Sequence, residues 1–128
     1  MATIGSFGAG GACVNTLSWD VEEHDGTVHI RLRGELDLAT APGLDRELRR
    51  LEADAGLMVV DLRRVTFIDS GGLRTLLLAD MRADEDGRRV AIVPSAPVRR
   101  ALDALGALAR GRVRRPLVVD DPAELHPA

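Results

Sequence analysis

Hydrophobic and polar residues alternate along two stretches near the beginning of the chain. They cover residues 17–23 and 27–33, and Asp25 and Gly26 lie between them. Alternation with a period of two is typical of a strand with one buried face, and Asp-Gly is a preferred pair at a tight β-turn. The pattern therefore predicts a β-hairpin.

Three later stretches have apolar residues at every third or fourth position, which predicts three amphipathic helices. Thr40 as N-cap and Pro42 in the first turn mark the beginning of the first helix. The second follows residues 67–72, and the third runs from Pro97 to Gly106. The apolar positions of the three helices are, in turn, Leu44, Leu48 and Leu51; Leu73, Leu76, Leu77 and Met81; and Val98, Leu102 and Leu105.

Short apolar runs at residues 57–60, 90–93 and 117–119 separate these helices and predict strands that are buried on both faces. Strands that alternate with helices imply parallel pairing through crossover connections. The predicted order is β-β-α-β-α-β-α-β, a single small α/β domain with a mixed β-sheet over residues 17–125. Residues 1–16 are rich in glycine and lack an apolar period, so we expect a flexible tail.

Composition narrows the function classes. The chain has 128 residues and a formal net charge of −3, which does not favour a nucleic-acid-binding protein. No apolar run approaches the roughly 20 residues of a membrane-spanning helix, and no secretory signal is visible at the N-terminus. We therefore expect a cytoplasmic protein with no membrane association.

Lysine is absent, and Cys13 is the only cysteine. A P-loop and a Schiff-base enzyme both need a lysine, whereas a disulfide or a cysteine-based zinc site needs further cysteines. Of the three histidines, His24 and His29 belong to the predicted hairpin and His126 to the C-terminal end. We expect no metal, no other cofactor and no enzymatic activity.

The segment Asp69-Ser70-Gly71-Gly72 lies between a predicted strand and the second helix. Either Asp69 or Ser70 could cap the unpaired N–H groups of that helix. A helix N-terminus also tolerates negative charge, so a phosphate on Ser70 would be favourably placed. The simpler interpretation is a cap and turn without further function.

Asp-Ser-Gly-Gly also surrounds the nucleophile of trypsin-like proteases, but this interpretation fails. That fold is built from β-barrels, is about twice as long and needs a histidine and a buried aspartate around the serine. A small hydrolase that uses Ser70, or the carboxylates of Asp37 and Asp69, is equally poorly supported because no suitable histidine, lysine or metal-ligand cluster accompanies them.

Three motifs in order, Gly34-Glu35-Leu36-Asp37, Val59-Val60-Asp61-Leu62 and Phe67-Ile68-Asp69-Ser70-Gly71-Gly72-Leu73, together resemble a STAS domain. This is the domain of sulfate transporters and anti-sigma factor antagonists, and the resemblance covers residues 17–125.

The resemblance implies an anti-sigma factor antagonist. When unphosphorylated, such a protein binds an anti-sigma factor, a serine kinase of the ATPase-like type, and so releases a sigma factor. The kinase phosphorylates the serine that corresponds to Ser70, and a phosphatase is a further partner to expect. Asp37 and Asp69 match acidic positions beside that serine. Gly71 departs from the family, which usually has serine or threonine there.

The expected partner-binding residues surround Ser70: Asp37, Asp69, Gly71, Gly72, Arg74 and Leu78. Leu78 falls outside the apolar stripe of the second helix and near Arg74, Thr75 and Arg82. It is either part of an exposed contact surface or one of the single exposed leucines that are normal on protein surfaces. The arginines at 110, 112, 114 and 115 are interpreted as a solvated loop, with binding to an acidic partner face as the alternative. The alternative function is a constitutive STAS scaffold or transport-system subunit, in which Ser70 is only a helix cap.

Overall fold

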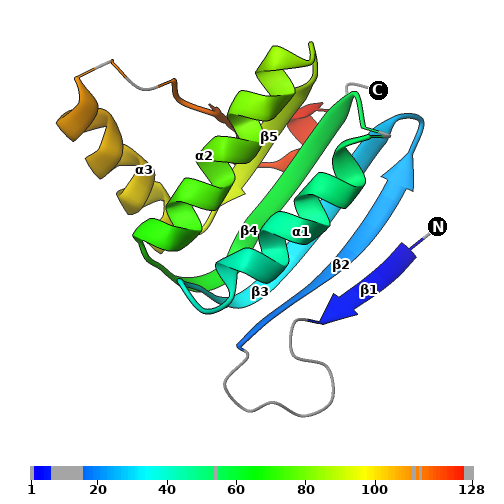
Figure 1. Cartoon of the computed structure of the whole chain (residues 1–128), viewed down its shortest axis with the longest axis horizontal. Helices are drawn as coiled ribbons and strands as arrows, with labels where there is room; N and C mark the ends of the chain where they lie inside the picture. Colours follow the sequence, from blue (N-terminus) through cyan, green and yellow to red (C-terminus); the bar gives the residue numbers. More distant parts are fainter. Residues whose placement is uncertain (1, 7–15, 54, 111, 113, 126–128) are drawn as a thin grey trace.

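A six-stranded sheet in the order β1-β2-β3-β4-β5-β6 forms the centre of the computed structural model (Figure 1). The structure describes residues 2–6, 16–53, 55–110, 112 and 114–125. The strands are β1 (Ala2–Ser6), β2 (Leu17–His24), β3 (Thr27–Leu36), β4 (Leu57–Ile68), β5 (Arg89–Pro94) and β6 (Leu117–Val118). The helices are α1 (Ala41–Glu52), α2 (Ser70–Glu85), α3 (Ala96–Ala109) and the 3-10 turn η1 (Pro122–Leu125).

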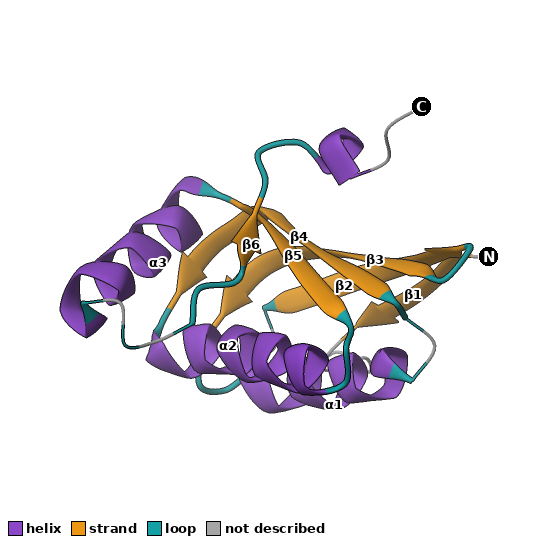
Figure 2. Cartoon of the chain, turned by 90° about the horizontal axis from the view of Figure 1, so that it is seen from above, coloured by secondary structure: helices purple, strands orange, loops and turns teal. Residues whose placement is uncertain are grey.

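The predicted α/β fold with a mixed sheet is confirmed. β2 and β3 form the antiparallel hairpin, and its turn has positive φ at Asp25 (50°) and Gly26 (79°), as a tight hairpin turn requires. From β3 to β6 the neighbouring strands are parallel, and each pair is joined through a helix. Figure 2 shows α1 and α2 side by side across one face of the sheet, whereas η1 lies beyond the opposite face.

One part of the predicted tail forms a strand. Residues 2–6 pair antiparallel with β2, from Ala2 opposite Glu22 to Ser6 opposite Ser18. The prediction that residues 1–16 form no element is therefore wrong for 2–6, while residues 1 and 7–15 lie outside the described part of the chain. An edge strand is held by backbone hydrogen bonds on one side, so it needs no apolar period in its sequence.

β4 continues eight residues beyond its predicted end at Val60. The register between β3 and β4 shifts between Arg31 and Arg33, and again between Gly34 and Glu35. These irregularities bring charged side chains to the surface of the strand, so its second half has no continuous apolar pattern.

Helix α2 is rotated relative to the predicted stripe. Leu76 is buried, but Met81 is 47% exposed. The buried side of α2 consists of mainly small residues: Gly72, Thr75, Leu76, Ala79, Asp80 and Ala83. Because small residues allow close approach, α2 packs tightly against its neighbours α1 and β5.

Two arginines of the predicted solvated loop bind back to the domain. Arg114 Nε donates to Asp80 Oδ2 over 2.9 Å, and Asp80 is only 2% exposed. Arg115 pairs with exposed Asp103 at 3.2 Å. The ion pair explains how a carboxylate can occupy the buried side of α2, since the guanidinium compensates its charge.

Candidate functional site

Asp69, rather than Ser70, caps helix α2. Its backbone is extended, and its Oδ1 accepts the N–H of Gly72 over 3.0 Å. Ser70 occupies the first helical position and is exposed. The two alternatives of the sequence are thus resolved, and the Ser70 hydroxyl is left available because the cap is provided by its neighbour.

The second oxygen of Asp69 connects α2 to the loop between β3 and α1. Oδ2 accepts the N–H of Leu38 over 3.0 Å, and the N–H of Asp69 itself donates to the Leu36 carbonyl over 3.2 Å. Both carboxylate oxygens are therefore used inside the domain. Asp69, which the sequence predicts as a partner-binding residue, positions Leu38 next to the beginning of α2.

Asp37 organises the same loop from the other side. Its Oδ1 accepts the N–H groups of Ala39 and Thr40, each over 3.0 Å. Thr40 occupies the predicted N-cap position of α1, but its side chain does not cap the helix. Its buried hydroxyl instead accepts the N–H of Asp37 and donates to the Glu35 carbonyl, both over 2.9 Å. The loop from Glu35 to Thr40 is consequently fixed by hydrogen bonds of its own.

Gly71 and Gly72 both lie against this loop, but they tolerate a side chain differently. A Cβ at Gly72 would come within 2.5 Å of the Leu36 carbonyl oxygen, which is too close for a carbon and an oxygen that are not bonded. A Cβ at Gly71 would lie 3.0 Å from Cγ of the exposed Leu38 side chain and 3.3 Å from Leu38 Cα and Asp69 Oδ1. Gly72 is thus needed for close approach, whereas Gly71 gives room to Leu38.

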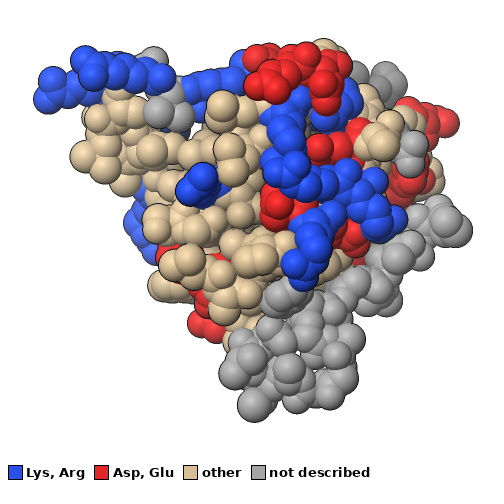
Figure 3. All heavy atoms as spheres, viewed as in Figure 1, with Lys and Arg blue, Asp and Glu red and all other residues tan. Residues whose placement is uncertain are grey.

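A shallow surface groove lies between the beginnings of α1 and α2. We call it the α1–α2 groove and define it by its exposed or half-buried lining residues: Leu38, Pro42, Asp45, Arg49, Gly71, Arg74 and Leu78. Leu38 is 71% exposed, the largest value but one among the exposed large hydrophobic residues of the described chain. Figure 3 shows mainly uncharged residues over this end of the two helices, with an isolated basic area among them, while charged residues gather at the other end.

The groove brings together three of the six predicted partner-binding residues, Gly71, Arg74 and Leu78, and adds others that the sequence did not predict. Leu78 is half-buried rather than fully exposed, and Thr75, expected beside it on the surface, is buried. Leu38 and Pro42 were missed. The available signal was a large apolar residue in the short loop between the second predicted strand and the first predicted helix, directly after Asp37.

Unpaired polar groups surround the Ser70 hydroxyl. Within the described residues, the N–H groups of Ser70 and Gly71 have no hydrogen-bond acceptor, and Arg74 has no ion-pair partner. Residues four apart on a helix lie on the same face, so Arg74 is one turn from Ser70. The beginning of α2 therefore offers two backbone N–H groups and one guanidinium group that could bind an anion.

Two further observations concern metal ligands and the length of the helices. The residues that the structure describes include no cluster of three or more metal-ligating side chains. Across the same residues, no helix is both long and apolar enough to span a bilayer.

The arrangement of elements and motifs is shared with known proteins. Residues 19–119 match a family model described as "Mlab, STAS domain". The chain belongs to the STAS domain family. This membership confirms the resemblance seen in the three motifs.

Curated relatives of this STAS protein are named as anti-sigma factor antagonists. The anti-sigma-F factor antagonist RsfB of Mycobacterium tuberculosis is 26% identical over 93 residues, which are 72% of this chain and 76% of RsfB. An anti-sigma F factor antagonist of Paenibacillus polymyxa is 30% identical over 95 residues, covering 70% and 80% of the two chains. The crystal structure of an anti-sigma factor antagonist from Mycobacterium paratuberculosis superimposes with a TM-score of 0.69 at 25% identity, covering 85% and 90%.

Proposed function

We propose that this STAS protein is an anti-sigma factor antagonist that binds an anti-sigma factor kinase through the α1–α2 groove and is released when Ser70 is phosphorylated. The observation that carries the proposal is that Asp69 and Ser70 have different roles at the beginning of α2. Asp69 provides the cap, which leaves the exposed Ser70 hydroxyl free for modification beside an apolar groove.

The names of the relatives support the partner class. RsfB and the Paenibacillus polymyxa protein are both antagonists of anti-sigma-F factors. An anti-sigma factor that is also a serine kinase would both bind the groove and modify Ser70, and its capture would release a sigma factor. A phosphatase would restore the unmodified state. The protein would act in the cytoplasm as a regulator without catalytic activity of its own.

Arg74 gives the switch a physical mechanism. In the unmodified protein its guanidinium has no partner among the described residues and is exposed at the edge of the groove, where it can pair with an acidic group of the kinase. A phosphate on Ser70 adds about −1.5 to −2 charges one helical turn away. The phosphoserine would then engage Arg74 and the free N–H groups of α2, withdrawing them from the partner.

Phosphorylation needs to remove only a small part of the binding free energy to release the partner. A loss of about 2.8 kcal/mol of binding free energy weakens an interface roughly 100-fold. Placing a desolvated phosphate opposite an apolar contact and removing one cation from the interface are together sufficient for such a loss. We expect the fold to change little, because the helix N-terminus stabilises the phosphate locally.

Intact mass after incubation with ATP and an anti-sigma factor kinase from a neighbouring gene tests the proposal. The wild-type protein should gain one phosphate, and Ser70→Ala should gain none. Ser95→Ala is the matched control, because Ser95 also lies at a helix start but uses its hydroxyl to cap α3. Phosphorylation that persists in Ser70→Ala would refute Ser70 as the acceptor.

The family description, which names Mlab rather than an anti-sigma factor antagonist, favours one alternative: a constitutive STAS scaffold or transport-system subunit. In that case Ser70 would never be modified. The partner would then bind Ser70→Asp and the wild-type protein equally well.

A further inference from the structure

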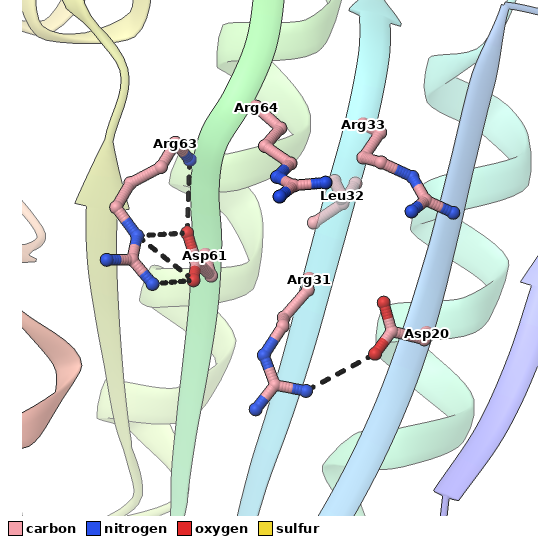
Figure 4. A pocket seen from close by; sticks show the side chains of 7 residues that line it. All are labelled: Asp20, Arg31, Leu32, Arg33, Asp61, Arg63 and Arg64. Carbon is pink, nitrogen blue, oxygen red and sulfur yellow. Dashed lines mark hydrogen bonds and ion pairs between the residues drawn. The ribbon is translucent and has the colours of Figure 1, made fainter.

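The face of the sheet opposite α1 and α2 contains a hollow of about 540 Å³ (Figure 4). Four arginines, two aspartates and one leucine line it: Asp20, Arg31, Leu32, Arg33, Asp61, Arg63 and Arg64. They come from the three adjacent strands β2, β3 and β4. We call this hollow the arginine hollow.

The irregular pairing of β3 and β4 produces this concentration of charge. The register skips one residue of β4 beside Arg31 and Arg33, so that Arg33 lies opposite Arg64. In a regular strand, Arg63 and Arg64 would point to opposite faces, but both side chains here are exposed and both line the hollow. The register shift therefore adds a cation that regular alternation would have directed towards the core.

The two aspartates are already paired. Arg63 donates to both oxygens of Asp61, with Nη2 to Oδ2 at 2.8 Å and Nε to Oδ1 at 3.0 Å. Burial opposes ionisation of Asp61, but the hydrogen bonds from Arg63 outweigh it and hold the Asp61 pKa below its ordinary value. Arg31 pairs with Asp20 at 3.2 Å. Arg31 also pairs with Glu22 at 3.1 Å. Each aspartate of the hollow therefore already has a guanidinium partner.

Arg33 and Arg64 are the remaining cations, and neither has an ion pair with any described residue. Figure 4 shows Arg64 extending over Leu32 and Arg33 reaching over β2, with the Arg31–Asp20 pair beside them. Two guanidinium groups on adjacent strands thus face one hollow without a counter-charge. Such an arrangement favours an anion with more than one acceptor oxygen, because guanidinium groups bind phosphate and carboxylate through paired hydrogen bonds.

We propose that the arginine hollow binds a small phosphate-bearing molecule, with Arg33 and Arg64 as its primary ligands. The volume lies in the range of small-molecule sites. An acidic protein partner fits less well, because a stable protein interface needs about 800 Å² on each side and this charge is confined to one concave spot. Since α1, α2 and Ser70 lie on the other face of the sheet, the site is separate from the proposed kinase-binding groove (Figure 2).

Calorimetric titration with inorganic pyrophosphate tests the site on the full chain. The wild-type protein should bind, and Arg33→Gln/Arg64→Gln should bind at least about tenfold more weakly, since two charge-assisted contacts are lost. Arg100→Gln/Arg112→Gln is the matched control: it removes the same charge from two exposed residues outside the hollow and should keep wild-type affinity.

The outcomes separate this site from non-specific attraction. An equal loss in both double variants, or no binding to the wild-type protein, would overturn the proposal. Preferential binding of a hexaglutamate peptide over pyrophosphate would also overturn it, in favour of an acidic polypeptide. Circular dichroism establishes that Arg33→Gln/Arg64→Gln is folded, and unchanged kinase binding by this variant would confirm that the hollow is independent of Ser70.

Discussion

The carboxylate of Asp69 accepts the backbone N–H of Leu38 over 3.0 Å, across 31 positions of sequence. Through this bond and the cap to Gly72, one side chain fixes two elements that meet at the candidate site. The exposed Leu38 side chain is thereby held beside Gly71. The groove is consequently a preorganised surface, and the residue that precedes Ser70 is its main support.

Removing the Asp69 carboxylate should destabilise the domain. Asp69→Ala loses both acceptors and should lower the free energy of unfolding by about 1–2 kcal/mol, the usual cost of a lost N-cap. Asp69→Asn keeps one acceptor and should lie between Asp69→Ala and the wild type in urea denaturation. Glu85→Ala, at the exposed end of α2, is the control. Equal stability of Asp69→Ala and the control would contradict the proposed bridging role.

The two glycines should respond differently to alanine. Gly72→Ala should cost about 1–3 kcal/mol because its Cβ overlaps the Leu36 backbone. Gly71→Ala should stay within about 1 kcal/mol of the wild type, since the helical preference of alanine offsets the displacement of Leu38. Thermal unfolding of both variants measures the difference. The reverse ranking would be inconsistent with the described packing.

Asp61 should contribute to acid sensitivity. Because its folded-state pKa is depressed below the ordinary value of 3.8, its ionised form stabilises the fold at neutral pH. The stability gap between the wild type and Asp61→Asn should be largest above that value and shrink as pH falls through it and then through the lower folded-state pKa. Urea unfolding at several pH values measures this gap. Exposed Asp25→Asn is the control, and a gap for Asp61→Asn that does not change with pH would speak against the ion pair with Arg63.

Arg74 should lower the pKa of a phosphate on Ser70. A phosphoserine normally loses its second proton near pH 6, and a neighbouring guanidinium favours the dianion. Phosphorus NMR titration of the phosphorylated protein should therefore give a lower pKa than that of phosphorylated Arg74→Gln. Arg100→Gln is the control. Identical titration curves for the wild type and Arg74→Gln would exclude the phosphoserine–Arg74 pair.

The sequence predicted the order of the main helices and strands because apolar periodicity reports which residues face the core. Leu44 and Leu48 of α1 are fully buried, as their spacing predicts. Periodicity failed on α2, where Asp80 is buried through its ion pair with Arg114, a contact that spans 34 positions. It also failed on β1, which is held as an edge strand by backbone pairing.

The candidate site was predicted in part. The motif around Ser70 identified the segment at which α2 begins, but spacing alone could not decide between two possible caps. Asp69 is the cap in the structure, and its second carboxylate oxygen binds the N–H of Leu38. Leu38 belongs to a loop that approaches α2 only in the folded chain, so the sequence does not reveal this contact. Leu38 was missed for the same reason: a single exposed leucine becomes informative only when its neighbours in space are known.

The affinity of the anti-sigma factor kinase for two forms of this protein tests the central claim most directly. Isothermal titration calorimetry should compare the unmodified protein with the protein phosphorylated on Ser70, both verified by mass spectrometry. We predict that phosphorylation weakens binding by roughly 100-fold. Equal affinity of the two forms would contradict the account.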